Sequence, residues 1–174
     1  PTITSTYTAT LREANCGAGI STYTSAVQVS VTPTPTITAT ASPTSICRGS
    51  SATLSASGAA TYTWNPGALT GAVVTVTPTT TTIYTVTGTS ASGCTSSRTV
   101  NLIVRPTPTV TAVSNPTTIC AGNSATLTAG GAATYTWLPG SATGVTTVVS
   151  PTVTTTYTVT GTNLVGCTNT RTVT

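Results

Sequence analysis

The stretch SATLSASGAATYTWNPG at residues 51–67 recurs with few changes as SATLTAGGAATYTWLPG at residues 124–140. In each copy a Tyr and a Trp stand two positions apart and alternate with Thr, as Tyr62 and Trp64 do in the first copy. Alternation with a period of two is typical of a β-strand that buries one face. The preceding segment around Leu54 is a second strand candidate, and Gly-Ala-Ala between them is a turn signal. The stretch therefore predicts antiparallel strands around a core centred on Trp.

The similarity extends over the whole chain with a period of about 73 residues. Residues 33–101 align with residues 106–174 without a gap, and most aligned positions are identical. Periods of this length indicate a repeat architecture. We predict three domains, which are the C-terminal half of an Ig-like repeat at 1–32, a complete repeat at 33–105, and at 106–174 a repeat that lacks the end of its last strand. We expect the 174 residues to be a window on a longer chain.

Strand signals recur at short intervals, and no segment shows a sustained helical period. We predict an all-β fold of tandem Ig-like antiparallel β-sandwich domains with about seven strands each. In the complete repeat these strands lie near 35–41, 45–48, 51–57, 60–65, 72–78, 81–88 and 95–104. The Pro-rich connectors at 33–35 and 106–108 are short and semi-rigid, so the repeats should follow one another in a rod.

The aromatic residues admit two interpretations. Trp64 and Tyr84 have equivalents at Trp137 and Tyr157, and an exposed set could form a platform on which sugars stack. Because the same residues recur in each repeat and alternate with Thr, we predict that these four form the core. Tyr23 is different, since it lies in GAGISTYTSA at 17–26, a stretch longer than its counterpart in the next repeat. It is the candidate ligand contact.

The cysteines also follow the repeat. Cys47 and Cys94 are 47 positions apart, and so are Cys120 and Cys167. One pair per repeat at constant spacing predicts the intradomain disulfides Cys47–Cys94 and Cys120–Cys167, with the partner of Cys16 upstream of the sequence. A zinc site is the alternative, but it needs four ligands, and each repeat offers two thiols without His or Asp. Disulfides imply an oxidising compartment.

Charged side chains are scarce, with five Lys or Arg, one Asp or Glu, and no His. Ser, Thr and Cys nucleophiles need a base to activate them, so we expect neither an enzyme nor a cofactor or metal site. The arginines are isolated, which speaks against nucleic-acid binding. No apolar run approaches the roughly 18 residues that suggest a membrane-spanning segment.

The motif ICxGxSATLxAxGAATYTWxPG, followed by TTTYTVTGTxxxGCTxTRTVT, resembles the Ig-like, PKD-like repeats of large secreted Bacteroidota surface proteins. The resemblance covers residues 47–101 and 120–174, and in half form residues 1–31. It implies cell-surface adhesins and extracellular fibres, commonly exported by the type IX secretion pathway. PKD domains usually carry a WDFGDG-like motif, whose place is taken here by the Trp-Asn-Pro-Gly of residues 64–67 and the Trp-Leu-Pro-Gly of residues 137–140.

We therefore expect a structural repeat protein that forms an extracellular stalk or filament at the bacterial cell surface. Its partners would be other copies of itself or neighbouring repeats. The alternative is an adhesin module that binds glycans, or host or neighbour surfaces, through variable loops. The loops differ little between the repeats, which favours the structural role.

Overall fold

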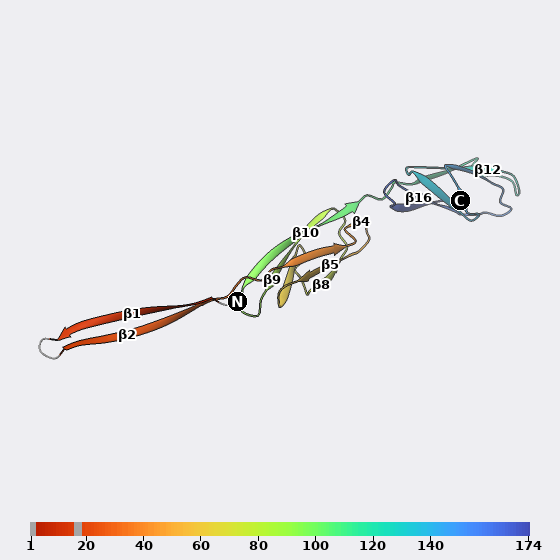
Figure 1. Cartoon of the computed structure of the whole chain (residues 1–174). Coiled ribbons are helices and arrows are strands. Elements are labelled where there is room, and N and C mark those ends of the chain that lie inside the picture. The colour runs from red at the N-terminus through yellow and green to blue at the C-terminus, as the bar shows by residue number, and fades with distance from the viewer. Residues whose placement is uncertain (1–2, 16–18) are drawn as a thin grey trace. The chain divides into compact units, whose positions relative to one another are not determined.

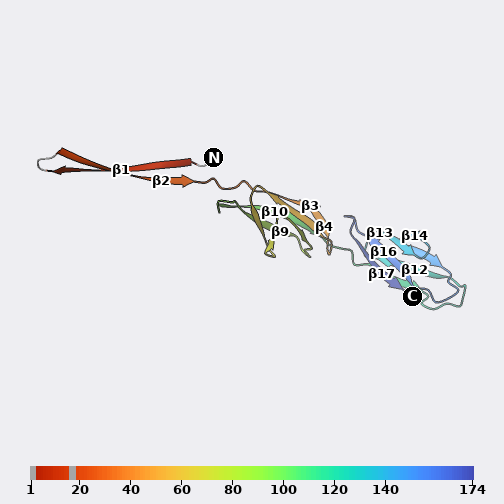
Figure 2. The same cartoon turned by 90° about the horizontal axis from the view of Figure 1, so that it is seen from below.

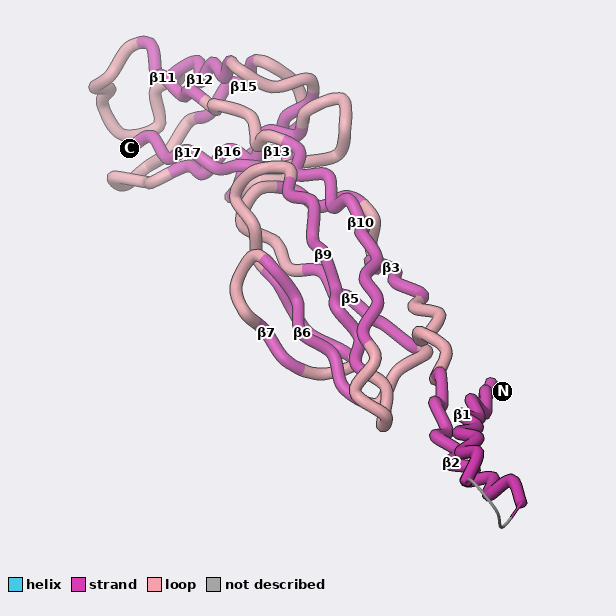
Figure 3. Tube along the Cα trace, turned by 90° about the vertical axis from the view of Figure 1, so that its left-hand side faces the viewer, coloured by secondary structure: helices cyan, strands magenta, loops and turns pink. Residues whose placement is uncertain are grey.

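The computed structural model describes residues 3–15 and 19–174, and within these residues every regular element is a β-strand (Figure 3). The predicted all-β fold of antiparallel β-sandwich domains is confirmed. Over the same residues, no helix is present that could cross a membrane. Cys16, for which the sequence predicts a partner upstream, lies outside the described residues.

The strands of the first and second repeats are β1 (Ile3–Asn15), β2 (Gly19–Val31), β3 (Thr38–Ser42), β4 (Ser45–Cys47), β5 (Ala52–Ser57), β6 (Thr61–Asn65), β7 (Leu69–Thr70), β8 (Val73–Val76), β9 (Thr82–Thr89) and β10 (Thr95–Arg105). Those of the third repeat are β11 (Thr111–Asn115), β12 (Ala125–Gly130), β13 (Thr134–Leu138), β14 (Ala142–Thr143), β15 (Thr146–Val149), β16 (Tyr157–Thr162) and β17 (Thr168–Val173). Figures 1 and 2 show most of these strands from two directions.

The chain forms two compact units, one of residues 1–40, 54–74 and 84–100 and the other of residues 41–53, 75–83 and 101–174. These units do not follow the repeat boundaries, because the second repeat contributes segments to both. The division into 1–32, 33–105 and 106–174 therefore describes the period of the sequence and not the compact units.

In the first unit, β1 and β2 form a long antiparallel hairpin (Figure 1). Its register places Tyr7 opposite Val27 and Leu11 opposite Tyr23, so these four side chains share one face. All four are at least 60% exposed. The counterpart of Tyr7 in the second repeat is Tyr84, which is buried. The apolar face of the hairpin is thus the face that forms the core in a complete repeat.

Strands of the second repeat form a five-stranded sheet in the order β4-β10-β9-β6-β7 and a three-stranded sheet in the order β3-β5-β8. Between the predicted strands at 60–65 and 72–78 the structure has the short strand β7, whose Leu69 pairs with Trp64 of β6. Strand β4 runs parallel to the end of β10, with Cys47 opposite Arg105. This pairing places the first cysteine of the repeat beside the last residue before the connector.

The third repeat repeats this plan with two sheets, in the orders β11-β12-β15 and β14-β13-β16-β17. Its core consists of buried apolar side chains from both sheets, namely Val110, Leu127, Ala129, Tyr135, Trp137 and Val159. A counterpart of β4 is missing, because residues 118–120 are not in a strand. In the second repeat β4 pairs with residues 103–105 of β10.

Polar atoms of the core aromatic side chains are satisfied in the same way in the second and third repeats. The indole Nε1 of Trp64 donates to the Gly71 carbonyl at 3.0 Å, and that of Trp137 donates to the Gly144 carbonyl at 3.1 Å. The Tyr135 hydroxyl accepts from the Ala132 amide at 2.7 Å and donates to the Ala132 carbonyl at 2.8 Å. A buried polar group without a partner is destabilising, so these bonds let aromatic side chains with polar atoms occupy the core.

Candidate functional site

The junction between the second and third repeats carries the one disulfide found in the described residues. Cys47 is bonded to Cys167, with an S–S distance of 2.00 Å and a Cα–Cα distance of 5.6 Å. The predicted pairs Cys47–Cys94 and Cys120–Cys167 are therefore wrong, and Cys94 and Cys120 carry free thiols. The bond joins the first cysteine of one repeat to the second cysteine of the next.

The length of β10 explains why the two cysteines of one repeat do not bond. Cys94 directly precedes this 11-residue strand, whereas Cys47 is paired beside its last residue, Arg105. An extended strand rises about 3.3 Å per residue, so the eleven steps from Cys94 to Arg105 span roughly 36 Å along β10. Disulfide-bonded cysteines need Cα atoms within about 7 Å. Cys47 therefore bonds across a connector to Cys167 of the next repeat rather than within its own repeat.

Hydrogen bonds hold the connector at 106–108 from the side of the third repeat. The Asn163 side-chain amide donates to the Pro106 carbonyl at 2.9 Å, and that of Asn169 donates to the Pro108 carbonyl at 3.0 Å. On the other side, the Arg48 amide donates to the Arg105 carbonyl at 2.9 Å. The disulfide and these bonds together fix the backbone that joins the two repeats.

The connector before the second repeat has a thiol in the corresponding place. The Cys94 Sγ lies 3.4 Å from the Thr32 hydroxyl oxygen and 3.7 Å from the Thr32 carbonyl oxygen. The hydrogen bond with the Thr32 hydroxyl lowers the pKa of Cys94 below its ordinary value, and a hydrogen bond from Ser92 adds to this, while desolvation acts in the opposite direction. A lower pKa means more of the reactive thiolate at neutral pH.

Replacing Thr32 with valine should slow the alkylation of Cys94 near neutral pH. Valine has the shape of threonine but no hydroxyl, so the thiolate loses its chief hydrogen bond and the pKa of Cys94 rises towards the ordinary value. The measurement is the rate of iodoacetamide modification of Cys94 as a function of pH, followed by peptide mass spectrometry. The rate at Cys120 in the same molecules is the internal control. Identical pH profiles for Cys94 in the two proteins would contradict the role given to Thr32.

A groove opens at the end of the third repeat, in the second unit. Its volume is about 520 Å³, and its lining includes Thr174, which follows β17. The apolar part of the lining includes Ile119, Ala125, Leu127, Val149 and Tyr157. In the second repeat, Ile46 and Val76 occupy the positions of Ile119 and Val149 and are buried, as is Leu102 near the end of β10. The groove thus lies where the second repeat places the last residues of β10.

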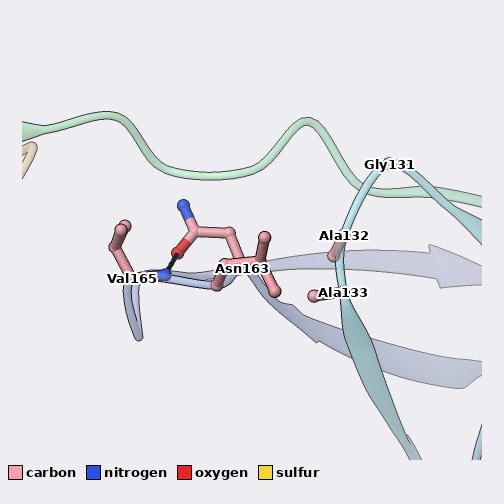
Figure 4. Close-up of a pocket in the computed structure, with 6 residues that line it drawn as sticks. Gly131, Ala132, Ala133, Asn163 and Val165 are labelled. Atoms are coloured by element: carbon pink, nitrogen blue, oxygen red, sulfur yellow. Dashed lines mark hydrogen bonds between the residues drawn. The ribbon is translucent and has the colours of Figure 1, made fainter.

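The third repeat also has a second, more open depression (Figure 4). It lies between the Gly-Ala-Ala turn at 131–133 and the loop at 163–165. The Val165 amide donates to the Asn163 side-chain oxygen at 3.1 Å, which orders the loop. Leu164 is 94% exposed at its tip. The corresponding loop of the second repeat reads Ser-Ala-Ser, so this apolar tip is a local departure from the repeat.

The other residues singled out in the sequence divide into two groups. Trp64, Tyr84 and Trp137 are buried, and Tyr157 is partly buried against the third-repeat core. Tyr23 is 62% exposed, but it lies in strand β2 on the apolar hairpin face rather than in a loop. The described residues contain no group of three or more His, Cys, Asp and Glu side chains that could hold a metal ion.

Thr32, Asn163 and Asn169 were not predicted from the sequence, although they make the contacts around the cysteines. The only available signal was their place within two to four residues of a connector or a cysteine. The spacing of 47 occurs twice in the sequence and predicted the wrong pairs, whereas the bonded cysteines are 120 positions apart, which is one period of 73 plus 47.

Comparisons with known proteins give structural similarities at low identity. No protein-family model matches the chain, and no curated protein matches it. An adhesin with which an Antarctic bacterium binds ice is 16% identical over 96% of this chain and 55% of its own, with a TM-score of 0.38. Three N-terminal domains of the highly immunogenic outer capsid protein of bacteriophage RB49 are 19% identical over 80% of this chain and 57% of their own, with a TM-score of 0.38.

Murine CEACAM1b is 14% identical over 79% of this chain and 98% of its own, with a TM-score of 0.36. TM-scores this low do not establish that two whole chains share one arrangement of domains.

Proposed function

We propose that the chain is part of an extracellular structural protein, a stalk or filament at a bacterial cell surface in which consecutive repeats are covalently fastened to each other. The observation that carries this proposal is the Cys47–Cys167 bond, which crosses a connector instead of closing a domain. A cross-link in that place restricts bending between consecutive repeats. Stiffness of this kind suits a stalk or filament, and it contributes nothing to ligand binding by a loop.

Three further features support the proposal. The disulfide fits an oxidising, extracytoplasmic compartment. The motifs resemble Ig-like and PKD-like repeats of secreted Bacteroidota surface proteins. The chain has no His, and the sequence holds a single acidic residue, Glu13, so a side-chain base for hydrolysis or group transfer is hardly available. We propose that the protein is not an enzyme.

If the protein is a stalk or filament, the length of the particle should increase with the number of repeats. Chains with one, two or four inserted copies of residues 33–105 are imaged by negative-stain electron microscopy. We expect extended particles that lengthen by roughly 30–40 Å for each added copy, from strands of seven to ten residues plus end loops. The matched variant Cys47→Ser should show a wider spread of bend angles. Compact particles whose length does not increase with copy number would refute the proposal.

A second candidate function is adhesion through the loop at 163–165, and the exposed Leu164 favours it. An apolar tip that replaces the Ser-Ala-Ser of the second repeat is suited to contact with a glycan or a protein surface. The test compares the protein with a variant in which residues 163–165 are changed to Ser-Ala-Ser, on glycan arrays and on intact cells. Binding that disappears with the exchange supports adhesion, and equal or absent binding in both proteins rejects this loop.

A further inference from the structure

The two free cysteines are presented by the same turns as the two bonded ones. In the turn before Cys94, the Ser90 amide donates to the Cys94 carbonyl at 2.8 Å. In the turn before Cys167, the Asn163 amide donates to the Cys167 carbonyl at 2.9 Å. The side chains of Ser90 and Asn163 in turn accept from the amides of the two cysteines, at 3.1 and 2.9 Å. Cys94 therefore has the backbone setting of Cys167.

The same equivalence holds for the first cysteine of each repeat. The Ser50 amide donates to the Cys47 carbonyl at 3.0 Å, and the Asn123 amide donates to the Cys120 carbonyl at 3.0 Å. The residue before the donor in each turn is a glycine with positive φ, at 85° for Gly49 and 81° for Gly122. Cys120 is exposed, so a partner can reach it.

The surroundings of Cys94 indicate where its partner would lie. Its sulfur contacts Thr32, which is the counterpart of Arg105 one period earlier. In the pairing of β4 with β10, Cys47 lies opposite Arg105. A first cysteine held in the same way beside Thr32 would meet the Cys94 thiol, as Cys47 meets Cys167.

We propose that Cys94 and Cys120 each form a disulfide with a cysteine of an adjoining repeat. In this arrangement, which we call the ladder, the first cysteine of each repeat bonds to the second cysteine of the next. Cys94 bonds to the first cysteine of the preceding repeat, 120 positions upstream, and Cys120 bonds to the second cysteine of the following repeat, 120 positions downstream, as in the bond already formed. The ladder holds whether the protein serves as a filament or as an adhesin.

The chemistry of each bond is thiol–disulfide exchange. Two cysteine thiols lose two protons and two electrons as their S–S bond forms. An oxidised small-molecule disulfide such as glutathione disulfide takes them up, and its own S–S bond breaks to give two thiols.

The test inserts one extra copy of residues 33–105 directly after Arg105 in the full chain, with Cys16 changed to Ser so that only cysteines of the described turns are counted. The protein is refolded in a glutathione buffer, alkylated without reduction, and weighed intact. The ladder predicts two alkylated thiols, because the inserted Cys94 bonds to the original Cys47 and the inserted Cys47 bonds to Cys167. Zero alkylated thiols would mean pairing within repeats, and four would mean that the inserted Cys94 stays free; either result overturns the proposal.

Two single substitutions in the extended chain are matched controls. The original Cys47→Ser should raise the count from two to three, because it releases the inserted Cys94. The original Cys94→Ser should lower the count to one, because this thiol has no partner in the extended chain. Pairing within repeats would instead give one alkylated thiol in both variants, which would contradict the ladder even if the unsubstituted chain had refolded poorly.

Discussion

Replacing Trp137 with alanine should unfold the third repeat while the second repeat stays folded. The indole is completely buried among Leu127, Val159 and other core side chains, and its Nε1 is hydrogen-bonded. Deleting a buried Trp side chain destabilises a protein by about 3–5 kcal/mol. A domain of some 70 residues has a free energy of unfolding of only about 4–10 kcal/mol. Hydrogen exchange of peptides from β13 and β16 measures the effect.

Thr136 provides the control, since it stands next to Trp137 on β13 but is exposed. Thr136→Ala should leave exchange almost unchanged. Trp137→Phe retains much of the packing and loses the bond to the Gly144 carbonyl, so its effect should be intermediate. Protection of β13 and β16 that survives Trp137→Ala would show that the core is not centred on this residue.

Appending Leu-Ile-Val-Arg after Thr174 should stabilise the third repeat by several kcal/mol. These are the residues at 102–105, where Leu102 is completely buried and Ile103 is 41% exposed. In the third repeat the added Leu would enter the groove beside Leu127 and Val149. Burial of one Leu side chain is worth about 1.5–3 kcal/mol, and the added Val contributes further apolar area. The measurement is the urea dependence of unfolding, together with hydrogen exchange at residues 118–120.

A tail of Ser-Ile-Ser-Arg is the matched control for this extension. It has the same length and the same outward Ile, but it lacks the two apolar side chains that alternate inwards. We expect residues 118–120 to become protected with the first tail, because they gain the parallel partner that β4 has in β10. Equal stabilisation by both tails would mean that the groove does not recognise the inward side chains.

The fold could be predicted from the sequence because its decisive signals are local. The alternation of Tyr135 and Trp137 with Thr is a property of five consecutive residues, and it is sufficient to place both side chains in the core. Tyr157 was predicted to be core as well, but it lines the groove and is only partly buried, whereas its counterpart Tyr84 is buried.

The disulfide pairing could not be predicted, for a geometric reason. Whether Cys47 bonds to Cys94 or to Cys167 depends on which end of the sandwich each turn occupies. That is decided by the parallel pairing of the three-residue strand β4 with the end of β10. A strand so short carries too little alternation to reveal its partner or its direction. The contacts of Asn163 and Asn169 with the connector follow from the same arrangement and were missed with it.

The bond between Cys47 and Cys167 also determines how the chain would respond to tension. The two cysteines are 120 positions apart, so a pull on the ends of the chain passes through the sulfur atoms and bypasses the residues between them. The connector at 106–108 lies inside this bypassed loop and carries no load while the bond is intact. If the second or third repeat were to unfold, the bypassed residues would add no length. Reduction of the Cys47–Cys167 bond would bring the residues between the two cysteines into the load-bearing chain. Their unfolding could then lengthen it.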